Sequence, residues 1–247
     1  MPRPVRGLAI AAYGILLWPA ALWLAWLLLA KVDFLYPAGY RLLDIPATLA
    51  AFVPHNRHGR QDFTRTDAAE HARLFASMAH AIRHGGEGLE GLRYRDPQGR
   101  ELGRLLTPDE VTHLRDVAHL VEAGERAGLL ALAGWAVLAV LLGLRRVPLP
   151  GAGRLLAGSS AVLALFAGAL LALGPVEVFY AWHRWVFPPE HPWFFYYQDS
   201  LMSSLMQAPN LFGFIGVLWL FTAILILLAL NAVARRAGQF VINRRSR

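Results

Sequence analysis

Long apolar runs separated by polar segments set the pattern of this chain. The runs cover residues 7–30, 127–147, 154–174 and 211–233, and none carries a charged residue at its centre. A helix needs roughly 20 apolar residues to cross a hydrocarbon core of about 30 Å, and each run reaches that length. The sequence therefore predicts four transmembrane helices.

The first run resembles a secretory signal peptide because Arg3 and Arg6 precede it. Its 24 residues, however, exceed the roughly 7–15 apolar residues of a signal peptide. The segment that follows, residues 31–36, has no small-residue cleavage site. We therefore predict that the first run is retained as a span.

Arginine placement orients the spans. The N-terminal tail, residues 145–154 around the connection between the second and third runs, and the tail 234–247 hold 10 of the 24 basic residues and none of the 17 acidic ones. Basic residues collect on the cytosolic side of membrane proteins. Both termini are therefore expected in the cytosol, with residues 31–126 and 175–210 on the outer face. The net charge of +7 then reflects topology and not nucleic-acid binding, which needs Lys and Arg clustered on a folded surface.

Residues 31–126 are patterned like a folded domain. Apolar periodicity predicts a short helix over residues 38–52, interrupted by Pro46, and an amphipathic helix over residues 66–84. Two short segments around an Asp-Pro-Gln-Gly turn predict a hairpin within residues 92–105. The expected fold class is an α-helical membrane protein with four transmembrane helices and a small mixed α/β extracytoplasmic domain between spans 1 and 2.

A helix begins just before the second span and carries the first candidate site. Thr107 and Glu110 form a capping box around a proline, and the helix is expected to run on toward the span. Glu110, His113 and Asp116 are three residues apart, which places the imidazole between two carboxylates on one face. A carboxylate-oriented imidazole is the usual architecture of a general base. Alternatively, Glu110 only caps the helix and His113 only packs.

The second candidate is His183, expected just past the outer end of the third span. It lies in an aromatic segment with Trp182, Arg184 and Trp185 beside it. Aromatic residues alone are explained by an interfacial belt, but a belt needs neither a histidine nor an arginine. A polar residue at the membrane boundary is a functional candidate.

Asp199 and the serines after it form a third group, at residues 199–204. Asp199 is expected to cap a helix, with orientation of His183 as the alternative. Serine nucleophiles are disfavoured because no Gly-x-Ser-x-Gly turn is present. The chain has no cysteine, which excludes disulfides and thiolate chemistry. A metal site built on His113, His183 and carboxylates is an alternative, but without a His-Glu-x-x-His pattern we predict no metal.

The order of these features resembles the lipoprotein intramolecular transacylase family of four-span bacterial membrane proteins. The matching stretches are residues 106–120, with Glu-x-x-His-x-x-Asp-Val, and residues 179–210, with a His-bearing aromatic segment and a downstream Asp and Pro. One departure is at Ala118, where the family pattern usually has lysine.

The resemblance implies an acyltransferase of the bacterial cytoplasmic membrane that needs no cofactor. Its substrates would be diacylated lipoproteins, whose acyl chain moves from the diacylglyceryl group to the N-terminal Cys amine. His113 and His183 would correspond to the family's two histidines. The implied site adds Asp116 and Glu110 as catalytic carboxylates and the following substrate contacts: Trp182, Arg184, Trp185 and Asp199.

Two other functions stay open at this stage. One is a lipid hydrolase or acyltransferase that uses the same histidines on another substrate. The other is a non-enzymatic membrane scaffold or partner-binding subunit. The oligomeric state is not predicted.

Overall fold

The chain forms two units in a computed structural model that describes residues 2–244. The first, here called the span unit, comprises Met1–Leu27, Gly124–Ala181 and Trp219–Arg247. The second, here called the loop unit, comprises Leu28–Ala123 and Trp182–Leu218. Each long segment of one unit is continued by a segment of the other, so several helices contribute residues to both.

Four helices are long and apolar enough to cross a membrane, as the four apolar runs predict. They are α1 (Arg3–Ala30), α5 (Pro108–Leu144), α6 (Ala152–Leu173) and α9 (Asn210–Arg244). Helix α5 has 37 residues, about 55 Å at 1.5 Å per residue, so only part of it can lie in the bilayer. Charged residues occur up to Arg126 and then stop until Arg145. The membrane segment of α5 is therefore its C-terminal half.

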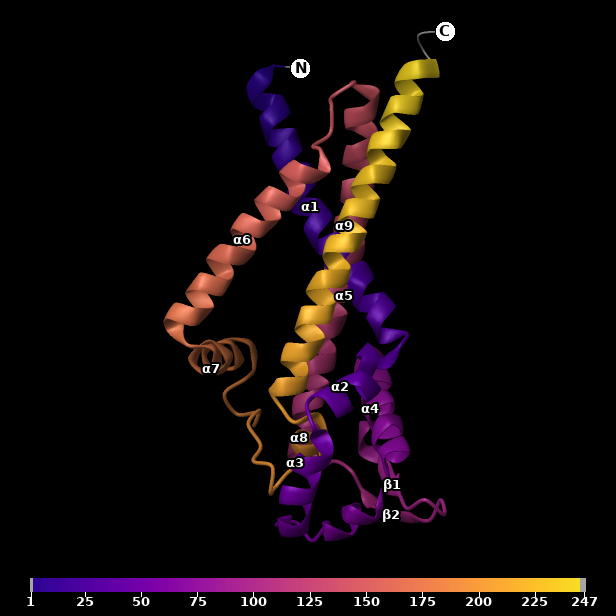
Figure 1. The fold of residues 1–247 in the computed structure, drawn as a ribbon, viewed down its shortest axis with the longest axis vertical. Coiled ribbons are helices and arrows are strands. Elements are labelled where there is room, and N and C mark those ends of the chain that lie inside the picture. Colours follow the sequence, from indigo (N-terminus) through magenta and orange to yellow (C-terminus); the bar gives the residue numbers. More distant parts are fainter. Residues whose placement is uncertain (1, 245–247) are drawn as a thin grey trace. The chain divides into compact units, whose positions relative to one another are not determined.

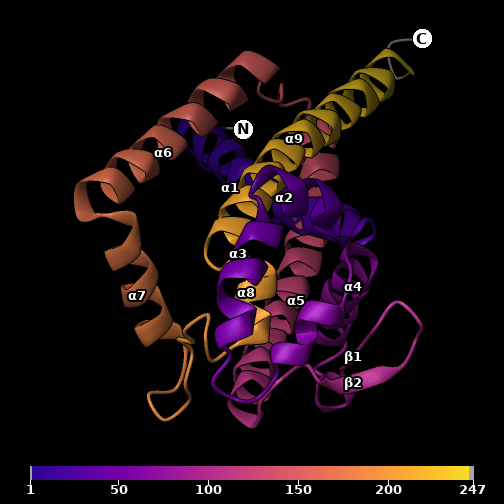
Figure 2. The same ribbon diagram turned by 60° about the horizontal axis from the view of Figure 1, so that its bottom comes forward.

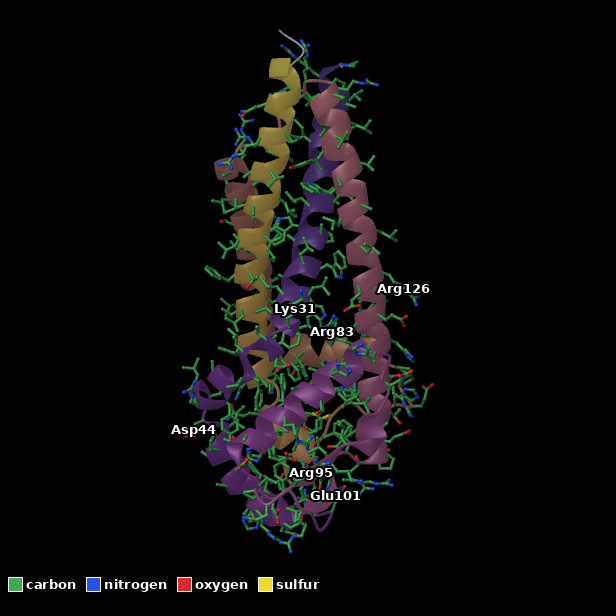
Figure 3. The ribbon with its side chains drawn as sticks, turned by 90° about the vertical axis from the view of Figure 1, so that its right-hand side faces the viewer. Lys31, Asp44, Arg83, Arg95, Glu101 and Arg126 are labelled. Carbon is green, nitrogen blue, oxygen red and sulfur yellow. The ribbon has the colours of Figure 1, made fainter. Side chains whose placement is uncertain are left out.

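Helices α1, α5 and α9 pack together within the span unit. The buried cluster between them includes Tyr13, Leu17, Trp135 and Leu227. The Tyr13 hydroxyl donates to Oδ1 of Asn231 at 3.0 Å, which joins α1 to α9 inside the apolar layer. A hydrogen bond of this kind satisfies two polar groups that lipid cannot. Side chains along the middle of these helices are mostly carbon (Figure 3).

Helix α6 diverges from the other span-unit helices in two views (Figures 1 and 2). It exposes apolar side chains widely; Leu165 and Leu171 are 77% and 79% exposed. A helix that exposes apolar residues to this extent is suited to hydrocarbon surroundings.

The loop unit opens with two short helices, α2 (Tyr36–Leu42) and α3 (Ile45–Phe52). The sequence predicted one helix over residues 38–52, and the break falls just before Pro46. Proline lacks an N–H and fits only the first turn of a helix, so a new helix starts there. Asp44, at the break, has a left-handed backbone with φ of 51°. Helix α3 then packs beside α8 (Leu201–Met206) (Figure 2).

The predicted amphipathic helix and hairpin are both confirmed. Helix α4 (Ala68–Arg83) is capped by Asp67, whose side chain accepts from the Glu70 amide, and it buries Leu74 and Met78. Strands β1 (Arg93–Arg95) and β2 (Glu101–Arg104) pair antiparallel. The labelled side chains of Arg95 and Glu101 mark this hairpin in Figure 3. Four short 3-10 segments complete the region between spans 1 and 2: Asp33–Leu35, Val53–His55, Gln61–Arg65 and Leu89–Gly91.

The sequence predicts an aromatic loop over residues 175–210, but the structure forms two helices within it. Residues 175–186 form helix α7 (Pro175–Val186), followed by an irregular segment and then α8 (Figure 1). The backbone N–H of Phe187 bonds to the His183 carbonyl at 3.0 Å where α7 ends. Pro188 and Pro189 follow directly, and proline cannot continue a helix.

Candidate functional site

The N-terminus of α5 is built on the predicted capping box. The Thr107 amide donates to Oε2 of Glu110 at 2.6 Å, and the Glu110 amide donates to Oγ1 of Thr107 at 3.3 Å. The other carboxylate oxygen of Glu110 accepts from the Ser200 hydroxyl, and both side chains are fully buried. Burial raises the pKa of Glu110, while its hydrogen bonds and Arg60 oppose the increase.

One turn further along α5, His113 lies close to His183 of α7. The two ring centroids are 6.4 Å apart, with 30° between the ring planes. The residues are 70 positions apart in the chain, so the fold of the loop unit brings them together. His183 is buried, with 7% of its surface exposed.

Aromatic rings surround the two imidazoles. Phe187 lies 4.9 Å from His113 and 5.4 Å from His183, measured between centroids. Trp193 is 4.8 Å from His183, and Phe195 is 6.0 Å from His113. Trp182 contacts the edge of the His183 ring at 4.8 Å. The imidazoles therefore face an apolar wall that contributes no charge.

This environment keeps His113 uncharged. Burial, together with the neighbouring His183, lowers the pKa of His113 to about 4, and Asp116 opposes that decrease. His113 Nδ1 is buried without a hydrogen-bond partner among residues 2–244. At neutral pH the ring is a free base with an unused lone pair or N–H, as a proton-transfer group requires.

The prediction that a carboxylate orients His113 through a hydrogen bond is wrong. Oδ2 of Asp116 instead accepts from Nδ1 of His191, at 2.7 Å. Glu110 is occupied by Thr107 and Ser200. Helical spacing correctly places all three residues on neighbouring turns, but tertiary partners claim both carboxylates. Asp116 therefore affects His113 electrostatically, by opposing the decrease in its pKa.

Sequence reasoning missed His191. It lies in the irregular segment, 75 positions from Asp116, and no local motif connects the two. The local signal was a polar pair, Glu190 and His191, placed between prolines just before an aromatic run.

Asp199 does not cap a helix, contrary to the prediction. The cap of α8 is Ser200, whose side chain accepts from the Ser203 amide at 2.8 Å. Asp199 pairs with Arg57 at 3.4 Å, and its carbonyl accepts from Arg60 at 3.0 Å. These contacts join the end of the aromatic segment to the region between spans 1 and 2.

The remaining predicted contacts lie on the surface of the loop unit. Arg184 is exposed, and Trp182 and Trp185 are 42% and 84% exposed. Ser203 and Ser204 are buried, which leaves neither hydroxyl open to a substrate. Among residues 2–244, no group of three His, Cys, Asp or Glu side chains is placed to hold a metal ion.

Four long apolar helices define the class as a four-span helical membrane protein. A small region of helices and a hairpin lies between its first two spans, and the fold brings two histidines together. Solved structures of the lipoprotein intramolecular transacylase Lit from Bacillus cereus share this fold. A variant with a His-to-Arg substitution has a TM-score of 0.61 at 13% identity, over 98% of this chain and 94% of that one. A second structure of Lit has a TM-score of 0.58 at 13% identity, over 99% of both chains.

The likeness is one of structure. No family model matches the chain, and no curated protein matches it in sequence. The resemblance stated from short motifs is thus matched by the fold across nearly the whole chain.

Proposed function

We propose that this protein is a membrane-embedded acyltransferase of the lipoprotein intramolecular transacylase type. It would move an acyl chain from the diacylglyceryl group of a lipoprotein to the amine of its N-terminal Cys, which gives the lyso form. The observation that carries the proposal is the pair of imidazoles, 6.4 Å apart within an aromatic wall, in a chain that shares the fold of Lit.

The proposed orientation puts this site on the outer face of the bacterial cytoplasmic membrane. Arginine placement supports cytosolic termini. The four candidate spans then return both polar segments to the outer side. The ester and the amine of an anchored lipoprotein lie at the same membrane boundary, so substrate and site would meet there.

In the proposed reaction, proton transfer prepares the nucleophile. An α-ammonium group has a pKa of about 8, so it must lose a proton before its nitrogen can attack. His113 is the base we assign, because its ring is neutral at neutral pH and its Nδ1 has no hydrogen-bond partner among residues 2–244. The charge of Asp116 would stabilise the imidazolium that forms, without a direct hydrogen bond.

Acyl transfer then follows. The nitrogen attacks the ester carbonyl, the C–N bond forms, and the electrons of the carbonyl move to its oxygen. Collapse breaks the C–O bond to the glyceryl group. The nitrogen loses its second proton at this stage, and the glyceryl oxygen gains one through an imidazole. His113 finally releases the ammonium's first proton to solvent, which returns its ring to the neutral form.

His183 is the group we assign to the developing negative charge. It would donate to the oxyanion or protonate the leaving oxygen, with exposed Arg184 as a helper from the same helix. Placing amine and ester in one site can lower the barrier by up to about 7–11 kcal/mol. The exposed rings of Trp182 and Trp185 would contact acyl chains, and Asp199 would hold the aromatic segment that packs on the two imidazoles.

The test follows the N-terminal peptide of a reporter lipoprotein in cells that make the protein. Intramolecular transfer conserves the peptide's total mass, so fragment ions must locate the acyl group on nitrogen. Wild type should yield the N-acyl form, while His113→Ala and His183→Ala should not. His119→Ala is the matched control, because His119 is exposed on the same helix.

The other outcomes separate the alternatives. Loss of one acyl chain from the mass, without N-acylation, would identify a lipid hydrolase. No change with wild type would favour a scaffold. N-acylation that survives both histidine substitutions would refute the catalytic assignment.

A further inference from the structure

The irregular segment between α7 and α8, here called the strap, carries consecutive aromatic residues whose side chains alternate between the histidine site and the surface. This strap, residues 188–199, places Trp193 and Phe195 against the imidazoles. The intervening Phe194 and Tyr196 are 47% and 60% exposed. Alternation of this kind is the mark of extended backbone. One face of the strap therefore forms the wall of the histidine site.

The end of the strap nearer α8 is held by several contacts. The Arg57 amide donates to the Gln198 carbonyl at 2.9 Å, and Arg57 and Arg60 both bind Asp199. Tyr197 donates from its hydroxyl to the Ala208 carbonyl at 2.7 Å. Loss of one of these contacts leaves others in place.

At the end nearer α7, a side-chain hydrogen bond joins the strap to α5. The chain turns at Pro188, whose carbonyl accepts from the His191 amide at 3.0 Å. His191 then donates from Nδ1 to Asp116 on α5 at 2.7 Å, with the imidazole 35% and the carboxylate 17% exposed. Asp116 stands one helical turn from His113. This hydrogen bond to Asp116 therefore fixes the strap directly beside the proposed base.

We propose that His191 is a positioning residue, whose hydrogen bond to Asp116 clasps the strap over the two imidazoles. The clasp keeps Trp193 and Phe195 in contact with the rings and keeps water out of the site. It also holds the Asp116 carboxylate away from His113, so that the imidazole stays unpaired. His191 itself does not touch the reacting atoms. The catalytic part of this inference rests on the proposed function; the clasp does not.

Two His191 variants distinguish the hydrogen bond from the ring. His191→Ala removes the donor, whereas His191→Asn keeps an N–H at the position of Nδ1. Exposed His119, one turn further along α5 than Asp116, provides the control His119→Ala. All three variants are made in the full-length protein and studied in a lipid nanodisc.

Limited chymotrypsin digestion reports on the clasp without any assay of activity. Cleavage inside residues 192–197, located by mass spectrometry, should be roughly 10- to 100-fold faster in His191→Ala. That range is the effect expected when a hydrogen bond to a charged group no longer opposes local opening. His191→Asn and His119→Ala should match wild type. Unchanged cleavage in His191→Ala, or equally fast cleavage in His191→Asn, would overturn the clasp.

Formation of N-acyl lipopeptide reports on positioning. His191→Ala should lose roughly 10- to 100-fold in rate, as expected for misplaced reacting groups, and His191→Asn should recover it. Faster cleavage with undiminished rate would overturn the positioning role. If wild type forms no N-acyl product, the proposed function and with it the catalytic role fail, while the digestion still decides the clasp.

Discussion

Glu110 and Ser200, 90 positions apart, share a hydrogen bond in which neither side chain reaches solvent. Glu110 begins the helix that carries His113, and Ser200 caps α8 at the end of the strap. One carboxylate therefore joins the two elements that bracket the histidine site. The capping box and the tertiary contact depend on the same side chain.

Replacement of Glu110 should therefore destabilise the protein strongly. Glu110→Ala removes the acceptor of the Thr107 amide in the capping box and leaves buried Ser200 without its acceptor, which alone costs about 1–3 kcal/mol. Glu110→Gln keeps one acceptor oxygen and should lose less. Thermal unfolding in detergent measures both, with exposed Asp109→Ala as the control. An unchanged midpoint for Glu110→Ala would show that the contact contributes little.

A second prediction concerns His71, a buried histidine outside the candidate site. Its Nδ1 and Nε2 bond to the hydroxyls of Tyr40 and Thr66, at 2.8 and 2.7 Å. Burial lowers the pKa of His71 to about 4, against the opposing effect of Asp67 and Glu70. The folded state therefore favours the neutral ring.

This depressed pKa makes stability depend on pH. The contribution is fully present above the unfolded value of 6.5 and is lost as pH falls from 6.5 toward 4. The full loss of unfolding free energy is about 3 kcal/mol, because each unit of difference between the folded and unfolded pKa values corresponds to about 1.36 kcal/mol. The unfolding midpoint of His71→Gln should fall less than that of wild type between pH 7 and pH 4.5. His113 contributes in the same direction in both proteins. Parallel pH curves would contradict this account.

Gly128 is required for the contact between α1 and α5. A Cβ atom there would lie 2.2 Å from Cβ of Trp23 and 2.3 Å from its Cγ. Gly128→Ala should therefore lower stability by about 1–3 kcal/mol, the usual effect of overpacking. Gly124→Ala is the matched control, because no atom lies within 4 Å of a Cβ on that residue of the same helix. Equal midpoints for the two variants would exclude this close approach.

Trp185 tests the proposed contact with acyl chains. Its side chain is 84% exposed, so Trp185→Ala should leave the unfolding midpoint within about 0.5 kcal/mol of wild type. The rate of N-acyl product formation should nevertheless fall, because an interfacial ring no longer engages the lipid. Varying the lipopeptide concentration separates the two parameters: KM should rise while kcat changes little. A change confined to kcat would argue against lipid contact.

Local patterns predicted most of the fold. Apolar runs located the spans, the Asp-Pro-Gln-Gly turn located the hairpin, and Thr107 with Glu110 located the start of α5. Each of these signals lies within a few residues or one helix, where hydrophobicity and hydrogen bonding act directly. Helix α7 was missed because aromatic density suggested an interfacial loop. The helical signal lies at the C-terminal end of α7, where His183 and Phe187, four residues apart, are both buried.

The sequence indicated which residues could form the candidate site, but it did not indicate the hydrogen-bond partners of Glu110 and Asp116. Helical spacing correctly put Glu110, His113 and Asp116 on one face. It could not indicate that Ser200 and His191 would take the carboxylates, because those contacts join segments 90 and 75 positions apart. Tertiary packing determined the partners, and Nδ1 of His113 has none within the part of the chain that the structure describes.

The most direct measurement uses purified protein in nanodiscs with a synthetic diacylglyceryl lipopeptide, and follows fragment ions that carry an N-terminal acyl group. Wild type should convert the lipopeptide to its N-acyl isomer without a change in total mass. His113→Ala, His183→Ala and the double variant should all be inactive to a similar degree, as expected when two groups act as a unit. Conversion by the double variant at the rate of wild type would contradict the central role of the imidazole pair.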